Sequence, residues 1–250
     1  MAEVAPTWLD VLVPMPAHSS LGPSLTYRHT VALPPGTLVR VPVGSREVLG
    51  VVWACHVQAP GDLAEEQTRD VIHVLTELPP LSNEWLKLVY FAAKYYQRSL
   101  GEVALSALPP QLRDATPEQL TRKFKRLQKA GTPQHTESAS ETAPPLTPEQ
   151  TAALEALELA RKPVLLYGTT GSGKTEVYLR AVERVLTAEP NAQALVMVPE
   201  INLTPQLESR FKARLGRFGV VAMHSGLTPA QRFAHWVLAH NGGARIVLGT

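Results

Sequence analysis

The segment that most constrains this chain is the run from Gly168 to Thr175, which fits the pattern G-x-x-x-x-G-K-[ST]. In such a loop, successive backbone N–H groups point into one concavity, and the following helix adds its positive N-terminal end. The apolar run 164–167 precedes the loop, and its composition predicts a strand that is buried on both faces. A strand, a glycine-rich loop and a helix in this order predict a phosphate-binding site.

Each residue type in the loop has a predicted role. The glycines permit the required backbone angles and a close approach to oxygen atoms. The Lys174 ammonium contacts the outer phosphates, and the Thr175 hydroxyl reaches a magnesium ion. The predicted nucleotide-binding residues of the loop are Gly168, Thr169, Thr170, Gly171, Ser172, Gly173, Lys174 and Thr175.

Gln150 lies upstream of the loop and has two interpretations. Its amide can both donate and accept a hydrogen bond, which suits recognition of adenine. Alternatively, Gln150 completes a capping box with Thr147 at the start of a helix. The residues alone leave both interpretations open.

Helices and strands alternate from Leu146 onward, which predicts βαβ units and a mainly parallel sheet. The string "VPEINLTPQ", residues 198–206, follows a predicted strand and therefore lies at the edge where open α/β sheets bind ligands. Its polar residues either contact a nucleic-acid backbone or cap the next helix. His224, at the end of another strand, is interpreted as a structural residue.

The first 80 residues contain short β-like runs that are broken by turn residues. We expect paired strands at 37–43 and 47–57. A helix follows, with Ser82 as its N-cap and Gly101 as its stop. Its aromatic residues are expected to contribute to the core.

A basic helix is expected at 113–130, with Thr116 and Gln119 as a capping box. Its Lys and Arg residues form either a solvated face or a contact to phosphate groups. The Ser-, Thr- and Pro-rich run 131–145 is interpreted as a flexible linker. The expected divisions are a DNA-binding domain (1–112), the basic helix with the linker (113–145), and a P-loop lobe (146–250).

Composition sets limits on the cellular context. The formal net charge is +2, so any nucleic-acid binding must rest on local patches. The single cysteine rules out an intrachain disulfide and fits a reducing compartment. The N-terminus lacks the pattern of a signal peptide, and no apolar run has membrane-spanning length. We therefore expect a soluble, cytoplasmic protein that is a monomer.

Several strings together resemble the primosomal protein N′ (PriA) family of replication-restart DNA helicases. "LLYGTTGSGKTEVYL", "ALVMVPEINLTPQ", "HSGLT" and "IVLGT" are similar to its first RecA-like lobe. "GTLVRVPVGSREVLGVV" and "AAKYYQRSLGEVALSALPP" are similar to its N-terminal DNA-binding domain. The fold class predicted from these strings is α/β, with a β-rich DNA-binding domain before a RecA-like P-loop lobe.

The resemblance implies an ATP-driven 3′-to-5′ helicase of superfamily 2, with ATP and Mg as cofactors and Gln150 contacting adenine. It implies forked and single-stranded DNA as partners, with the N-terminal domain holding the nascent 3′ end. Primosome proteins and single-stranded-DNA-binding protein are implied as protein partners. The predicted DNA contacts are Tyr27, Arg40, Glu200, Thr204, Gln206 and Thr250.

Three departures from the family pattern change these expectations. Leu25, Thr26 and Tyr27 stand where the family shows Phe-Asp-Tyr, so the carboxylate for a terminal hydroxyl is missing. Tyr27 would still stack on a base. The middle segment is too short for a winged helix, and the basic helix is interpreted as its remnant. The family's DExH strand, second lobe and zinc ligands are not among these residues.

We accordingly expect this chain by itself to bind ATP weakly, without hydrolysing it or unwinding DNA. Its catalytic residues are not identified. The main alternative is a non-catalytic module that binds forked DNA and assembles other proteins, with a vestigial P-loop. A P-loop kinase is disfavoured because it leaves the N-terminal half unexplained.

Overall fold

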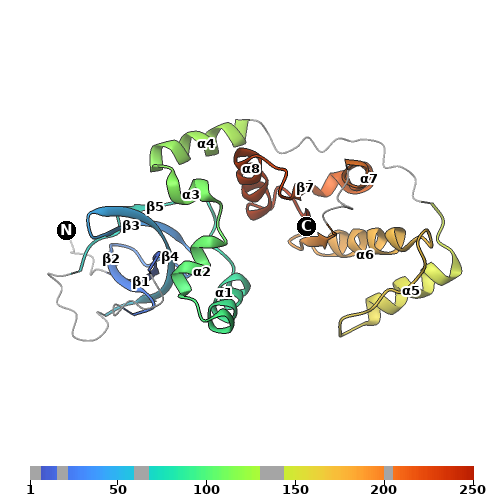
Figure 1. Ribbon diagram of the computed structural model, residues 1–250, viewed down its shortest axis with the longest axis horizontal. Coiled ribbons are helices and arrows are strands. Elements are labelled where there is room, and N and C mark those ends of the chain that lie inside the picture. Colours follow the sequence, from blue (N-terminus) through green and yellow to red (C-terminus); the bar gives the residue numbers. More distant parts are fainter. Residues whose placement is uncertain (1–6, 16–21, 59–67, 130–143, 200–204) are drawn as a thin grey trace. The chain divides into compact units, whose positions relative to one another are not determined.

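A computed structural model describes residues 7–15, 22–58, 68–129, 144–199 and 205–250. The chain divides into two compact units, Met1–Leu127 and Gln128–Thr250 (Figure 1). Each unit has its own hydrophobic core. Within the described ranges, no helix is long and apolar enough to cross a membrane.

The first unit is built on an antiparallel sheet with the strand order β2-β1-β4-β3-β5. The expected pairing of strands near 37–43 and 47–57 is confirmed, because β3 and β4 form a hairpin in which Val43 lies opposite Arg46. Gly44 in its turn has a φ of 60°, a value that glycine adopts without strain. The strands are β1 (Thr7–Leu12), β2 (Leu25–His29), β3 (Leu38–Val43), β4 (Arg46–His56) and β5 (His73–Val74).

One apolar cluster of the first unit lies on one face of this sheet, and further apolar side chains such as Leu12 are buried on the opposite face. Successive side chains of a strand point to opposite faces, so apolar residues at every second position line the same side. Leu9, Tyr27, Val39 and Val52 meet there and are almost fully buried. The alternate residues of β1 and β2, among them Asp10, face away from this cluster.

The helices of the first unit follow one another closely along the chain: α1 (Asn83–Tyr96), α2 (Leu100–Ser106), α3 (Pro110–Asp114) and α4 (Pro117–Lys129). The N-cap at Ser82 is confirmed, since its hydroxyl accepts a hydrogen bond from the Trp85 backbone N–H. The stop at Gly101 is wrong. The first helix ends with Gln97 in the left-handed conformation, and Gly101 lies inside α2, where it packs against the Val13 backbone.

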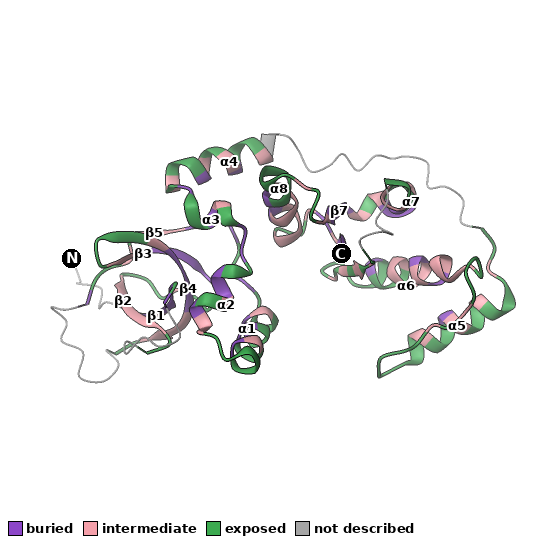
Figure 2. Cartoon of the chain, in the orientation of Figure 1, coloured by how far each residue is buried: buried purple, intermediate pink, exposed green. Residues whose placement is uncertain are grey.

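The aromatic residues of α1 do not belong to the core, which corrects the expectation from sequence. The buried stripe of this helix consists of Leu86, Val89 and Ala93. The rings lie away from this stripe and are exposed, and Figure 2 colours part of α1 as exposed. Two of the rings are stacked with their centroids 5.7 Å apart. The exposed rings are Tyr90, Phe91, Tyr95 and Tyr96, all more than half exposed.

The α4 helix packs on the first unit through Leu120 and Phe124, which are buried. Its capping box is confirmed by reciprocal hydrogen bonds between Thr116 and Gln119. Three basic side chains on its opposite face are exposed: Arg122, Lys125 and Arg126. A phosphate contact by this face stays a prediction.

The second unit contains a parallel sheet with the strand order β6-β8-β7, which confirms the predicted α/β class. Phe211 and Leu215 from one helix and Leu179 from another pack on Ile246 and Leu248 of the central strand. The elements are α5 (Pro148–Leu159), α6 (Lys174–Ala188), β6 (Ala194–Met197), α7 (Pro205–Leu215), a 3₁₀ turn (Gly216–Phe218), β7 (Val220–Met223), α8 (Pro229–His240) and β8 (Ile246–Gly249).

The strand predicted at 164–167 is absent from this structure. The Leu165 and Tyr167 side chains are 85% and 90% exposed, and the segment forms no ladder with any strand of the described residues. A strand of a parallel sheet is stable only when neighbours pair with its backbone and helices cover its faces. The apolar composition identified a segment suited to a sheet, but the described strands provide no such neighbours.

Candidate nucleotide and DNA sites

The P-loop has the compact form that its sequence predicts. Gly171 and Gly173 have φ values of 83° and 81°, in the region that favours glycine. The Lys174 ammonium lies inside the loop and donates to the carbonyls of Gly168 and Thr169, each at 2.7 Å. The structure therefore brings the predicted run 168–175 together around one cation at the start of α6.

A cavity of about 760 Å³ opens beside the loop. Its lining combines loop residues, including Lys174 and Thr175, with Arg210 and Arg214 from α7. This size suits a small ligand of nucleotide dimensions. Sequence analysis missed the two arginines, because only the packing of α7 on α6 places them next to the loop.

Gln150 forms the capping box and also reaches the P-loop. Its Oε1 accepts from the Thr147 N–H at 2.9 Å, and its Nε2 lies 3.5 Å from the Gly173 carbonyl oxygen. A side chain at position 173 would collide with this amide, since an added Cβ would lie 2.2 Å from Nε2. A second cavity, of about 400 Å³, is lined by Gln150, Tyr167 and Lys174. The capping role is thus confirmed, and recognition of adenine stays a prediction.

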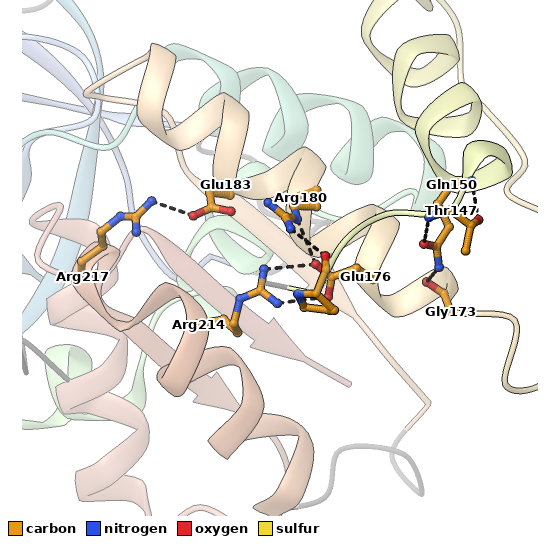
Figure 3. Close-up of polar contacts among 9 residues, drawn as sticks. Thr147, Gln150, Gly173, Glu176, Arg180, Glu183, Arg214 and Arg217 are labelled. Carbon is orange, nitrogen blue, oxygen red and sulfur yellow. Dashed lines mark hydrogen bonds and ion pairs between the residues drawn. The ribbon is translucent and has the colours of Figure 1, made fainter. Parts of the chain in front are cut away.

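Glu176 directly follows the loop, at the start of α6, and its ion pair with Arg214 connects α6 to α7 (Figure 3). Its carboxylate receives two hydrogen bonds of 3.1 Å from Arg214 and one of 2.9 Å from Arg180. The Arg214 and Glu176 side chains are only 7% and 15% exposed. Burial by itself raises the pKa of Glu176, but the bonds from the two arginines outweigh it and lower that pKa below its ordinary value.

We expect Glu176→Gln to lower the free energy of unfolding of the second unit by about 2 kcal/mol at pH 7, because it leaves two arginines without their charged partner. A depressed carboxylate pKa stabilises the fold above the unfolded-state value and loses that contribution as pH falls through the folded-state pKa. The difference between variant and wild type should therefore shrink in acid. Urea unfolding at pH 7 and pH 3 measures both effects.

The control for that prediction is Glu183→Gln. Glu183 pairs with Arg217, whose side chain is 48% exposed, so its loss should cost less than about 1 kcal/mol. Equal losses of unfolding free energy in the two variants would show that the Glu176 ion pair stabilises the fold no more than the exposed pair of Glu183 and Arg217.

The carboxyl-terminal edge of the parallel sheet carries a further cavity of about 540 Å³. Thr250 lines it together with His224, Ser225 and Arg232. Arg232, from α8, is a cationic group that sequence analysis missed. Gln206 is exposed near the start of α7, while Glu200 and Thr204 lie outside the described residues.

Arg40 is a structural residue, and its prediction as a DNA contact is wrong. Its side chain is only 4% exposed. Its guanidinium donates to the backbone carbonyls of Leu112, Arg113 and Ala115 at the end of α3. Burial keeps this guanidinium out of reach of a phosphate at the surface, and its bonds secure the helical segment to β3.

Tyr27 likewise presents no ring surface for stacking on a base. The residue is 3% exposed within the sheet core, and its hydroxyl donates to the Pro42 carbonyl at 2.9 Å. Burial raises the pKa of Tyr27 to about 12, with nearby Arg69 acting in the opposite direction. Arg69 itself donates to the Gly44 carbonyl, so the structure adds an exposed cation near this end of the sheet.

Comparison with known proteins gives a family match for each of the two units. The model of the PriA 3′ DNA-binding domain matches residues 10–109, and the DEAD/DEAH box helicase model matches residues 147–250. The chain belongs to the PriA family. The replication restart protein PriA of Helicobacter pylori is 33% identical over 91% of this chain, and that of Haemophilus influenzae is 29% identical over 88%. The Bacillus subtilis PriA is 46% identical over 42% of the chain.

The chain spans only part of the length of these PriA proteins. It covers 38% of the Haemophilus influenzae protein, 32% of the Helicobacter pylori protein and 13% of the Bacillus subtilis protein. The matched ranges assign the antiparallel sheet to the DNA-binding domain and the P-loop unit to the helicase domain.

Proposed function

We propose that this chain provides the DNA-end recognition and the ATP-binding half-site of a replication-restart helicase. The observation that carries the proposal is the presence, in one chain, of a 3′ DNA-binding domain followed by a DEAD/DEAH helicase domain with a formed P-loop. The activity proposed for the whole protein is ATP-driven 3′-to-5′ unwinding at forked DNA, followed by primosome assembly.

The proposed nucleotide lies in the cavity beside the P-loop. Lys174 would exchange its bonds to the Gly168 and Thr169 carbonyls for bonds to phosphate oxygens, which are stronger acceptors. Arg210 lines the same cavity and adds positive charge beyond the loop. The base would lie toward Gln150, in the adjoining cavity.

The proposed magnesium ligand in this chain is the hydroxyl of Thr175. The Thr175 hydroxyl lines the cavity beside Lys174, and Mg²⁺ prefers oxygen ligands while it keeps several waters and phosphate oxygens. Thr175 would thus hold the ion, whose chemistry there is to neutralise phosphate charge. The Tyr178 hydroxyl, 3.3 Å from the Thr175 Oγ1, helps to orient that ligand.

Single-stranded DNA is proposed to follow the carboxyl-terminal edge of the parallel sheet. Thr250 and Arg232 line one cavity there, and the start of α7 presents Gln206. Arginine and hydroxyl groups are common donors to phosphate oxygens. The proposed protein partners are primosome proteins and single-stranded-DNA-binding protein.

The proposal is tested by fluorescence anisotropy of the full chain with labelled forks. A fork with a leading-strand 3′ end at the junction should bind about tenfold more tightly than a fork that lacks this strand, at fixed salt. Equal affinities that fall together with added salt would show phosphate attraction without end recognition. Fork-stimulated ATPase activity of this chain, lost in Lys174→Ala, would contradict the proposal of a half-site that binds ATP without hydrolysing it.

A further inference from the structure

The outer surface of α1 carries four exposed aromatic rings. Phe91 and Tyr95 are 61% and 69% exposed, and Tyr90 and Tyr96 are also more than half exposed. The Phe91 and Tyr95 rings are stacked, and the Tyr96 ring meets that of Tyr95 edge-on, with centroids 5.0 Å apart. A cluster of large exposed apolar side chains marks an interaction site, unlike single ones scattered over a surface. These four residues are called the aromatic surface of α1.

Two lysines lie beside these rings on the same helix. Residues three, four and seven positions apart share one side of a helix, so Lys87, Phe91 and Lys94 follow one another along α1. Tyr90 lies on the same side, because it is three residues after Lys87 and four before Lys94. Both lysines are exposed, and neither forms an ion pair with a residue that the structure describes. The two ammonium groups are therefore available to contact an anion.

The charge around the aromatic surface is positive. The α1 helix contains a single carboxylate, Glu84, in its first turn. Arg98 lies just after the helix and pairs with Glu102 at 3.4 Å, with both side chains exposed. An ion pair this exposed is weak, so Arg98 is able to contact a phosphate instead. A ligand that carries both negative charge and flat apolar groups complements this surface.

Single-stranded nucleic acid combines these two properties. Its bases have flat faces that stack on aromatic rings, and its phosphates contact cationic groups. In a duplex the base faces are covered by neighbouring base pairs, so an unpaired strand is the form that uses the rings. Lysine is depleted in interfaces between proteins, so the two lysines favour nucleic acid over a protein partner. Seven residues of helix rise about 10 Å and stacked nucleotides about 3.4 Å each, so the surface spans about three nucleotides.

We propose that the aromatic surface of α1 binds single-stranded DNA, with bases stacked on its rings and with Lys87 and Lys94 on the phosphates. This inference rests on the proposed function in one respect, because single-stranded DNA is a partner proposed there for the whole chain. The surface belongs to the first unit, whereas the edge of the parallel sheet belongs to the second, and it requires neither a DNA end nor ATP. Tyr27 and Arg40, the contacts predicted for the first unit from sequence, are buried, so exposed groups of α1 take their role.

The main test measures binding of the full chain to a labelled circular strand of thymidines, which has no 3′ end. In the double variant Phe91→Leu/Tyr95→Leu both positions stay apolar but lose their rings, so the affinity for the circle should fall about tenfold. The variant Phe91→Tyr/Tyr95→Phe exchanges the two rings and should bind more tightly than the leucine variant. Fluorescence anisotropy measures the affinities, and thermal unfolding verifies that each variant is folded.

Leu88→Ala is the matched control for the leucine variant. This side chain is exposed on the same helix but has no ring, so its loss should change the affinity for the circle by less than about twofold. A tenfold loss in Leu88→Ala, equal to that of the leucine variant, would show a general apolar contact and would overturn base stacking.

The lysine contacts are tested by the salt dependence of the same binding. For single strands, the logarithm of affinity falls with the logarithm of salt concentration, with a slope of about −0.7 per phosphate contacted. Lys87→Gln/Lys94→Gln should therefore make the slope shallower by about 1.4. Lys162→Gln, at an exposed lysine of the second unit, should leave the slope unchanged. An unchanged slope in the double lysine variant would overturn the phosphate contacts.

Photo-cross-linking of the wild-type chain locates the strand without relying on any variant. A circle that carries 5-iodouracil should attach to the peptide that contains α1, as identified by mass spectrometry. Cross-links confined to residues 205–250, or a leucine variant that binds as tightly as wild type, would overturn the inference. Sedimentation of a dimer that the leucine variant dissociates, without cross-links to α1, would also overturn it, because the surface would then join two copies of the chain.

The outcomes also distinguish this inference from the proposed function. If the chain prefers forks with a 3′ end but the circle does not contact α1, the inference fails and the proposed function stands. If the chain binds neither forks nor single strands, the proposed function fails and this inference fails with it.

Discussion

Lys174→Ala should weaken nucleotide binding by about 100-fold. The ammonium lies at the centre of the P-loop, where it donates to two carbonyls at 2.7 Å. Bonds from a cation to charged phosphate oxygens contribute about 1.5–3 kcal/mol, and each 1.4 kcal/mol is a tenfold change. Titration of the full chain with a fluorescent ATP analogue in the presence of magnesium measures the loss.

Lys162→Ala is the matched control, because this lysine is exposed and lies just before the apolar segment that leads to the loop. Its affinity should stay within about twofold of wild type, as for a surface charge. Unchanged binding in Lys174→Ala would mean that the P-loop is vestigial, as in the non-catalytic alternative.

Gly101→Ala should lower the free energy of unfolding of the first unit by at least about 3 kcal/mol. An added Cβ would lie 1.8 Å from the Val13 carbonyl oxygen, so α2 or the end of the β1 segment must move. Alanine has a higher helix propensity than glycine, so the substitution would stabilise α2 if the added methyl group fitted. A loss of stability would therefore report the collision with Val13. Urea unfolding followed by tryptophan fluorescence reports this unit through the buried Trp8.

Gly216→Ala is the control variant, because it makes the same substitution at a position where the added methyl group has no neighbours. No atom lies within 4 Å of the added Cβ, so we expect a change below about 1 kcal/mol. A Gly101→Ala variant as stable as wild type would show that α2 does not approach Val13 as closely as described.

Local sequence patterns predicted the elements whose stability depends on residues that are close to one another in the sequence. The hairpin of β3 and β4, the capping boxes and the glycines of the P-loop all follow from short-range rules. These features also define most of the candidate nucleotide site. The interaction of Gln150 with Gly173 was not predicted, because it depends on how α5 packs against α6.

The errors come from residues whose burial depends on distant partners. The resemblance implied Arg40 as a DNA contact, but its side chain is buried and donates to carbonyls at the end of α3. Tyr27 has the aromatic ring of a stacking residue, but this ring is buried in the core of the first unit. Conversely, the rings of α1 are exposed because smaller residues fill the stripe that packs on the unit. Sequence pattern does not encode which apolar side chains the tertiary structure covers.

The bonds of Arg40 also decide where this protein can be shortened. Two of its three acceptors, the carbonyls of Arg113 and Ala115, lie beyond the expected domain boundary at residue 112. A fragment ending at 112 would keep a buried guanidinium but remove most of its acceptors, a costly loss for a charged group. Fragments of the DNA-binding domain for biophysical work should therefore extend through α4, which also retains the buried Leu120 and Phe124.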